Sequence, residues 1–149
     1  QDGTKRYTVV YMSWILLAIL SALFAALVAV FAKLGLKAID PTIATTVRVT
    51  IMTAFFIVVS FSLGKFKLLS SIDNRALMFI ILSGIAGALS WLCYFAAMKV
   101  GSASAVSALD RLSIVFIVIM GALFLGEALT IKTGIGALLI ALGAFFFVL

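Results

Sequence analysis

Residues 7–32 run through the first part of this chain without one charged side chain. A helix that crosses a lipid bilayer needs about 20 mostly apolar residues, so this run is longer than one crossing requires. The rest of the sequence has the same character, because 66% of the 149 residues are hydrophobic and only 11% are charged. Soluble domains carry roughly 25% charged residues. The sequence therefore predicts an integral membrane protein.

Apolar stretches separated by short polar connections predict an all-α membrane protein with five transmembrane helices. Asp40 and Pro41 predict the start of the second helix, since proline favours the first helical position and the residue before it resists a helical conformation. The most polar stretch, residues 64–75, predicts a loop at one membrane surface. An alternative with four spans, in which the first or the last helix lies in the interface, stays open. We expect the helices over residues 13–36, 42–63, 76–98, 103–125 and 131–149.

The basic residues predict how these helices are oriented. Positive charge favours the cytoplasmic side, and the side of the N-terminus holds more of it, so we expect the N-terminus inside. Met12 resembles a natural start, so residues 1–11 are interpreted as an extension that is non-native or upstream of the true start. Without that extension the two sides are nearly balanced, and the balance would permit insertion in both orientations. The basic residues on the N-terminal side are Lys5, Arg6, Lys65, Lys67, Arg75 and Lys132, and those on the other side are Lys33, Lys37 and Lys99.

The composition also excludes several kinds of chemistry. The chain has no histidine and one cysteine, which leaves no side chains for a Cys/His metal site or a histidine-based catalytic triad. We therefore expect no metal, no cofactor and no enzymatic activity. The net charge of +6 is spread over helix ends rather than gathered in one patch. Membrane orientation explains it better than nucleic-acid binding.

Asp110 and Arg111 are adjacent within the otherwise apolar residues 100–126. An ionisable side chain at membrane depth costs about 3 kcal/mol on insertion scales, so such residues usually face a protein interior or a watery cavity. Arg48 and Asp110 are each expected about 10 Å from the same membrane surface, given a rise of about 1.5 Å per residue. The sequence therefore predicts that Arg48 pairs with Asp110. Arg111 is then left for a substrate, another subunit or a lipid headgroup.

Two interpretations of these charges stay open. In the first, at least one of them lines a transport cavity; in the second, Arg48, Asp110 and Arg111 form a static network that fixes helix packing. Trp91 either belongs to the aromatic belt at the membrane interface or stacks on a flat or cationic substrate. The remaining candidates have simpler interpretations: Tyr94 as a belt residue, Lys33 as a snorkelling side chain, and Glu127 as a surface group near Lys132.

Several motifs resemble the EamA domain of the drug/metabolite transporter superfamily. They are residues 94–106 (YFAAMKVGSASAV), residues 109–116, residues 121–130 (GALFLGEALT) and residues 31–36 (FAKLGL). The similarity covers essentially residues 13–149. Residues 12–149 are therefore interpreted as one EamA-like domain of five helices, equivalent to one half of a ten-helix transporter.

The resemblance implies a fold, an assembly and a function. Most members of the family carry two five-helix units in one chain, as inverted repeats around a central substrate cavity, whereas this chain has one. It is similar to the short bacterial and archaeal members in which an aspartate and a basic residue occur at positions 110 and 111. The resemblance implies that two copies assemble as a homodimer, and an antiparallel pair would reproduce the inverted repeat. It also implies location in the cytoplasmic (inner) membrane.

The leading hypothesis is a secondary transporter that moves a small metabolite or drug-like solute by alternating access. The small multidrug resistance proteins, a related branch, depend on a glutamate in the middle of their first helix. Residues 13–36 contain no acidic side chain, which argues against the proton-coupled antiport of that branch. The alternative hypothesis is a structural or accessory membrane subunit in which the charged residues only fix helix packing.

Overall fold

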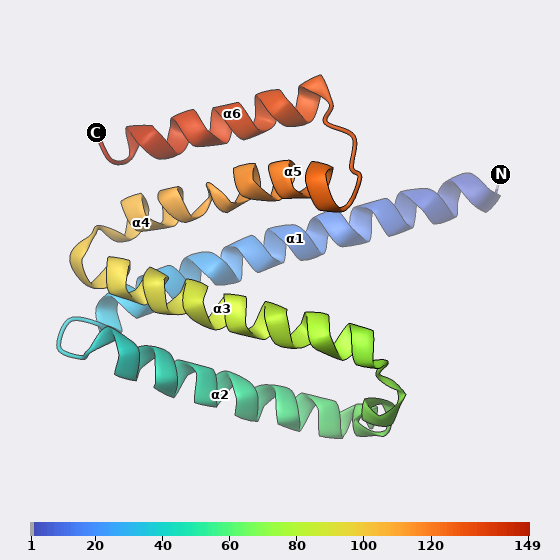
Figure 1. Ribbon diagram of the computed structural model, residues 1–149, viewed down its shortest axis with the longest axis horizontal. Coiled ribbons are helices and arrows are strands. Elements are labelled where there is room, and N and C mark those ends of the chain that lie inside the picture. The colour runs from blue at the N-terminus through green and yellow to red at the C-terminus, as the bar shows by residue number, and fades with distance from the viewer. Residues whose placement is uncertain (1) are drawn as a thin grey trace.

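A computed structural model of the protein describes the backbone of residues 2–149 and the side chains of residues 14–149. Within this part of the chain every regular element is a helix, as Figure 1 shows. The elements are α1 (Asp2–Gly35), α2 (Pro41–Ser62), the 3-10 helix η1 (Lys65–Ser71), α3 (Asn74–Val100), α4 (Ala103–Asp110), α5 (Ser113–Phe124) and α6 (Ile131–Phe146).

Four segments are long and apolar enough to cross a membrane: Trp14–Gly35, Pro41–Ser62, Asn74–Val100 and Ala103–Phe124. The last of these spans combines α4 and α5. The fifth predicted helix is present but shorter than expected, because α6 has 16 residues and a length of about 24 Å. The predicted all-α, multi-pass membrane fold is confirmed. The extension at residues 1–11, with Lys5 and Arg6, lies outside the side chains that the structure describes.

The start of α2 agrees with the prediction from Asp40 and Pro41. The Asp40 Oδ1 atom accepts hydrogen bonds from the backbone N–H groups of Thr42 (2.8 Å) and Ile43 (3.3 Å). These bonds satisfy two of the N–H groups that a helix leaves unpaired at its first turn. The predicted loop at residues 64–75 was only partly right, because most of it folds as the 3-10 helix η1.

The helix predicted over residues 103–125 is interrupted in the middle. At residues 110–112 the backbone tightens: the N–H of Arg111 donates to the carbonyl of Ala108 (3.1 Å), and that of Leu112 donates to the carbonyl of Leu109 (2.9 Å). Both bonds span three residues instead of the four of an α-helix, which is the pattern of a 3-10 turn. A pattern of apolar residues does not distinguish these two turns. The sequence therefore predicted one helix where the structure has α4 and α5.

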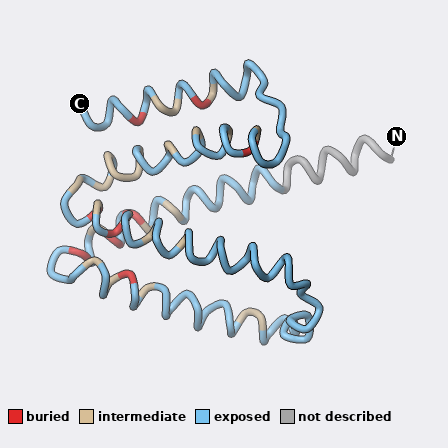
Figure 2. The backbone as a smooth tube through the Cα atoms, in the orientation of Figure 1, coloured by how far each residue is buried: buried red, intermediate tan, exposed pale blue. Residues whose placement is uncertain are grey.

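The main buried cluster of the described chain is small and lies at one end of α1 and α3. In Figures 1 and 2 these two helices run side by side at the end that faces the α3–α4 turn. Most other large apolar side chains are exposed, which suits helices that face lipid or a second protein surface. The buried cluster consists of Ala29, Ala32, Leu36, Phe95 and Met98.

Lys33 and Lys99 join the C-terminal ends of α1 and α3 by a reciprocal exchange of hydrogen bonds. Lys33 on α1 donates from its Nζ atom to the carbonyls of Met98 (2.9 Å) and Gly101 (2.7 Å) at the end of α3. The sequence predicted that Lys33 snorkels, and in the structure its ammonium reaches carbonyls at the end of a neighbouring helix. Because the two helices end at the same level, the Lys33 ammonium lies close to carbonyls at the end of α3 that lack an intrahelical partner.

Lys99 on α3 returns the same kind of contact to the end of α1. A cation at a helix C-terminus is favoured by the helix dipole and by the carbonyls that lack an intrahelical partner. The sequence analysis had assigned Lys99 only to the surface charge count. Its Nζ atom donates to the carbonyls of Leu36 (2.5 Å), Lys37 (3.3 Å) and Ile39 (3.0 Å).

Gly101 closes the tight turn between α3 and α4, and we expect Gly101→Ala to destabilise the protein by roughly 1–3 kcal/mol, as overpacking does. An added Cβ atom would lie 2.8 Å from Cγ2 of Val106 and 3.2 Å from the carbonyl oxygen of Ala97. Thermal unfolding in detergent micelles measures the effect. Gly84→Ala is the matched control, since its added Cβ would have no neighbour within 4 Å. Equal unfolding temperatures for the two variants would contradict the tight turn.

Candidate solute-binding cavity

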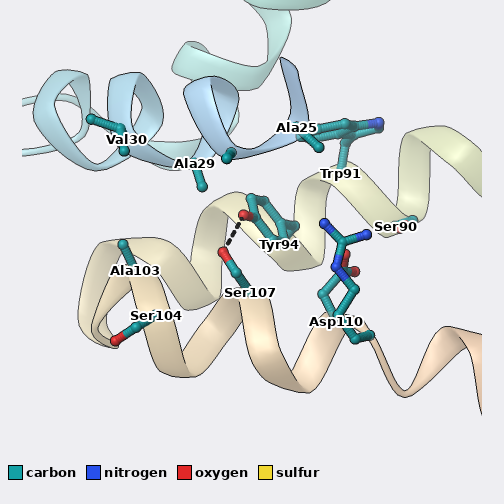
Figure 3. Close-up of a pocket in the computed structure, with 12 residues that line it drawn as sticks. Ala25, Ala29, Val30, Ser90, Trp91, Tyr94, Ala103, Ser104, Ser107 and Asp110 are labelled. Atoms are coloured by element: carbon teal, nitrogen blue, oxygen red, sulfur yellow. Dashed lines mark hydrogen bonds between the residues drawn. The ribbon is translucent and has the colours of Figure 1, made fainter. Parts of the chain in front are cut away.

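A cavity of about 490 Å³ lies between α1, α3 and the residues of α4 and its end (Figure 3). Sites for small molecules in proteins commonly have volumes of about 300–1,000 Å³. Helix α1 contributes only alanine and valine side chains, whereas α3 and the α4 region contribute aromatic, hydroxyl and charged groups. The lining residues are Ala25, Ala26, Ala29, Val30, Ser90, Trp91, Tyr94, Ala103, Ser104, Ser107, Asp110 and Arg111.

The polar side of the cavity is held together by a bond between α3 and α4. The Tyr94 hydroxyl and the Ser107 Oγ atom lie 3.0 Å apart, drawn as a dashed line in Figure 3. The Trp91 and Tyr94 rings also meet edge to face, with centroids 5.5 Å apart. Tyr94 was predicted to belong to the aromatic belt, and in the structure it lines the cavity. A partly buried hydroxyl is stabilised by a hydrogen-bond partner, and Ser107 supplies one.

Asp110 and Arg111 both line this cavity. Asp110 is the last residue of α4, and Arg111 follows it in the tightened turn. Seven residues separate Asp110 from the start of α4, which corresponds to about 10 Å of depth. Among residues 14–149 neither side chain is engaged in a hydrogen bond or an ion pair within the protein. The cavity thus contains one carboxylate and one guanidinium that the protein itself does not neutralise.

Arg48 does not pair with Asp110, so that prediction was wrong. Its guanidinium carbon lies 3.6 Å from the centroid of Trp91 and 5.8 Å from that of Phe95. Helix α2 packs against α3, whereas α4 packs against α1, α3 and α6. Residue spacing gives the position of a charge along its helix but not the lateral order of the helices, which separates Arg48 from Asp110.

Trp91 separates the cavity from the groove beside α2. It lines the cavity, and it also lines a second hollow of about 480 Å³ to which Arg48 contributes. The sequence predicted that Trp91 could stack on a cationic substrate. In the structure Trp91 stacks on a cation of the chain itself, the guanidinium of Arg48. The Nη1 atom of Arg48 is buried without a hydrogen-bond partner, so attraction to the aromatic ring is the main compensation that the structure shows for this charge.

Glu127 lies away from the cavity. The predicted contact with Lys132 is not formed as an ion pair in the described side chains. Glu127 instead folds over α5, and its backbone N–H donates to the carbonyl of Gly121 (3.1 Å). A Cβ atom added to Gly121 would lie 2.8 Å from the Oε2 atom of Glu127. Gly121 therefore leaves the space into which the carboxylate folds.

The serines of the cavity were missed by sequence reasoning. Ser104, Ser107 and Arg111 are spaced by three and four residues, which places them on one face of a helix. This spacing could have identified the serines, but only the charged residues Asp110 and Arg111 were predicted as candidates in this segment. No group of three or more His, Cys, Asp or Glu side chains lies together within the described residues. The polar side chains that line the cavity carry hydroxyls, the indole N–H of Trp91 and one opposite pair of charges.

A chain of membrane-crossing helices that surrounds a cavity with charged groups at membrane depth has the features of a multi-pass membrane transporter. Residues 12–149 match the EamA-like transporter family, and the chain belongs to this family. The resemblance noted from the sequence motifs is thereby confirmed. Membership of this family supports a membrane transporter.

A similar protein is found in Sinorhizobium sp. It is named "Uncharacterized transporter in cobO 3' region" and is 44% identical over 132 residues. The match covers 89% of this chain and 94% of that relative, so the two are of nearly equal length. No solved structure matches the chain.

Proposed function

We propose that the protein is a secondary transporter that moves a small organic solute across the bacterial or archaeal inner membrane by alternating access. The cavity between α1, α3 and α4 is the proposed solute site. The observation that carries the proposal is the presence of Asp110 and Arg111 in its wall, at a depth of about 10 Å from the membrane surface. Ionisable residues within membrane-spanning segments usually face a protein interior or a watery cavity and serve a function, so a solute-binding role accounts for the two residues.

The proposed active unit is a homodimer. Asp110, Arg111 and most of the large apolar side chains are exposed in the single chain, and a second copy would enclose the cavity from its open side. An antiparallel arrangement of the two copies would give the inverted repeat common among secondary transporters. Cysteines introduced one at a time, in a Cys93→Ser background, test the orientation. Labelling of one site from both sides of the membrane in whole cells supports the antiparallel dimer, and labelling from one side contradicts it.

The alternative function, an accessory subunit with a charge network that fixes helix packing, has no specific observation in its favour. Such a network would join Arg48, Asp110 and Arg111. Arg48 instead stacks on Trp91, and Asp110 and Arg111 line the cavity. Within the described side chains no ion pair links the three residues, so the contacts that would define this role are missing.

Uptake into proteoliposomes tests the proposal. A thermal-shift screen over amino acids, polyamines, sugars and cationic drugs first identifies solutes that stabilise the purified protein, because a ligand that binds only the folded state raises its stability. Uptake of a radiolabelled hit is then compared between wild type and Asp110→Asn. We expect the variant to lose uptake by tenfold or more, since a hydrogen bond to a charged group contributes roughly 1.5–3 kcal/mol.

Asp73→Asn is the matched control, because Asp73 precedes α3 outside the cavity and makes no capping bond with its side chain. We expect it to transport at the wild-type rate. Membrane insertion and unfolding temperature should be unchanged in both variants. An Asp110→Asn protein that transports normally, or one that no longer folds, would instead support the packing role.

A further inference from the structure

Trp91 lies between two spaces of opposite chemistry. On one side is the proposed solute cavity, whose lining includes hydroxyl groups and the charged residues Asp110 and Arg111. On the other side is the groove between α2 and α3, which has a volume of about 480 Å³. Arg48 is the one charged residue among those that line this groove. Trp91 lines both spaces and is therefore a wall that they share.

The groove between α2 and α3 is apolar and lies on the outside of the described helices. Val49, Phe56 and Ile57 line it and are exposed. The hydroxyl of Thr53 also lines it but donates to the carbonyl of Val49 (2.9 Å), so this group is satisfied within α2. Helix α2 is long and apolar enough to cross the membrane, and apolar side chains on the outside of such a helix suit contact with lipid. The occupant that fits this groove is a lipid acyl chain.

Three side chains hold Trp91 in the shared wall. The rings of Tyr94 and Phe95, also on α3, meet it at centroid distances of 5.5 Å and 5.9 Å. The third contact comes from α2, where the guanidinium carbon of Arg48 lies 3.6 Å from the centroid of the Trp91 ring. Arg48 lines the groove and is not among the described residues that line the cavity. It therefore holds the indole from the side of the groove.

We propose that Arg48 is a positioning residue, which holds Trp91 in the cavity wall and so keeps lipid acyl chains in the groove out of the cavity. The inference rests on the proposed function in taking this cavity as the solute site. Attraction between a cation and an aromatic ring is strongest where water is excluded, and the Nη1 atom of Arg48 is buried without a hydrogen-bond partner. A displaced indole would let hydrocarbon approach Asp110 and Arg111, at a cost for ionisable side chains.

Fluorescence quenching of Trp91 in lipid nanodiscs tests the proposal. The chain has two tryptophans, so a Trp14→Phe background leaves Trp91 as the reporter. Phosphatidylcholine with brominated acyl chains quenches an indole that contacts lipid. In Arg48→Ala we expect this quenching to rise about twofold or more, since loss of a cation–π contact shifts the equilibrium between a held and a released ring by roughly tenfold. Lipid quenching equal to that of the protein with Arg48 overturns the proposal.

Two further substitutions separate the charge of Arg48 from its bulk. Arg48→Met keeps a long side chain without a charge, and Arg48→Lys keeps the charge without the planar guanidinium. We expect quenching in Arg48→Met to resemble that in Arg48→Ala, and quenching in Arg48→Lys to lie between Arg48→Met and the protein with Arg48. If Arg48→Met left the quenching unchanged, bulk alone would hold the indole and the assignment to the cation would be overturned.

Two controls distinguish a role at Trp91 from a general loosening of the helices. Arg75→Ala removes an exposed arginine from the first turn of α3, and we expect it to leave the quenching of Trp91 unchanged. In a Trp91→Phe background the remaining reporter is Trp14 on α1, and its quenching should be the same with and without Arg48→Ala. A rise at Trp14 as large as that at Trp91 would contradict a positioning role.

Uptake separates this inference from the proposed function. If quenching of Trp91 responds to Arg48 as expected but proteoliposomes accumulate none of the screened solutes, the transport proposal fails and the role of Arg48 in holding Trp91 stands. If a solute is accumulated while quenching of Trp91 is the same with and without Arg48→Ala, the positioning role fails and the transport proposal stands.

Discussion

Replacing Trp91 with alanine is expected to destabilise the protein by about 3–5 kcal/mol, the usual range for removing a large aromatic side chain from a packed site. Trp91 contacts the rings of Tyr94 and Phe95 and lies beneath the guanidinium of Arg48. The variant therefore loses packing and also leaves a partly buried cation without its aromatic partner. Thermal or denaturant unfolding in micelles measures the loss.

A double-mutant cycle isolates the contribution of the cation. We expect Arg48→Leu to lower the cost of Trp91→Ala, with a coupling energy of about 1–2 kcal/mol, because a desolvated cation–π contact has this magnitude. Trp91→Phe keeps an aromatic face and should recover most of the stability. Strictly additive effects of the two substitutions would show that the contact between Arg48 and Trp91 is not formed in solution.

Lys33→Met is expected to cost about 2 kcal/mol or more of stability. Methionine keeps most of the length of the side chain but cannot donate to the carbonyls of Met98 and Gly101, with which Lys33 bonds at 2.9 Å and 2.7 Å. Hydrogen bonds to charged groups contribute roughly 1.5–3 kcal/mol each. Because these carbonyls lie at the end of a helix, water competes with Lys33 for them. Unfolding in micelles at several salt concentrations measures the cost.

Lys37→Met is the matched control for Lys33→Met. Lys37 belongs to the same group of basic residues at this end of the molecule but is exposed, and its ammonium makes no hydrogen bond with any of the described side chains or their backbone. We expect its stability to stay within about 0.5 kcal/mol of wild type, as is usual for surface substitutions. Similar losses for Lys33→Met and Lys37→Met would indicate a general effect of net charge and would argue against the exchange between α1 and α3.

Much of the fold was predictable because lipid imposes strong constraints on sequence. Some helix ends are marked by residue types that favour those positions. Asp40 and Pro41 are an example, and the observed start of α2 agrees with them. The interruption at residues 110–112 was not predictable, because it depends on which carbonyl each N–H selects. Hydropathy is the same for an α-helical and a 3-10 turn.

The candidate site was predictable in part. The energetic cost of an ionisable side chain inside the membrane indicated Asp110 and Arg111 as candidates, and both line the cavity. The predicted partner of Arg48 was wrong because residue spacing gives the position of a residue along its helix and not the lateral order of the helices. The contacts of Lys33 were not predictable for a related reason: they come from the end of α3, 65 residues away in the chain, and no local pattern indicates them.

The short 3-10 turn at residues 110–112 has a mechanical consequence. It divides the fourth span into two arms, and α5 with its 12 residues forms an arm about 18 Å long. A rotation of about 10° at the turn would displace the far end of such an arm by about 3 Å, by simple leverage. Asp110 and Arg111 are at the fulcrum. A small displacement of their side chains would therefore be amplified into a larger displacement at the far end of α5.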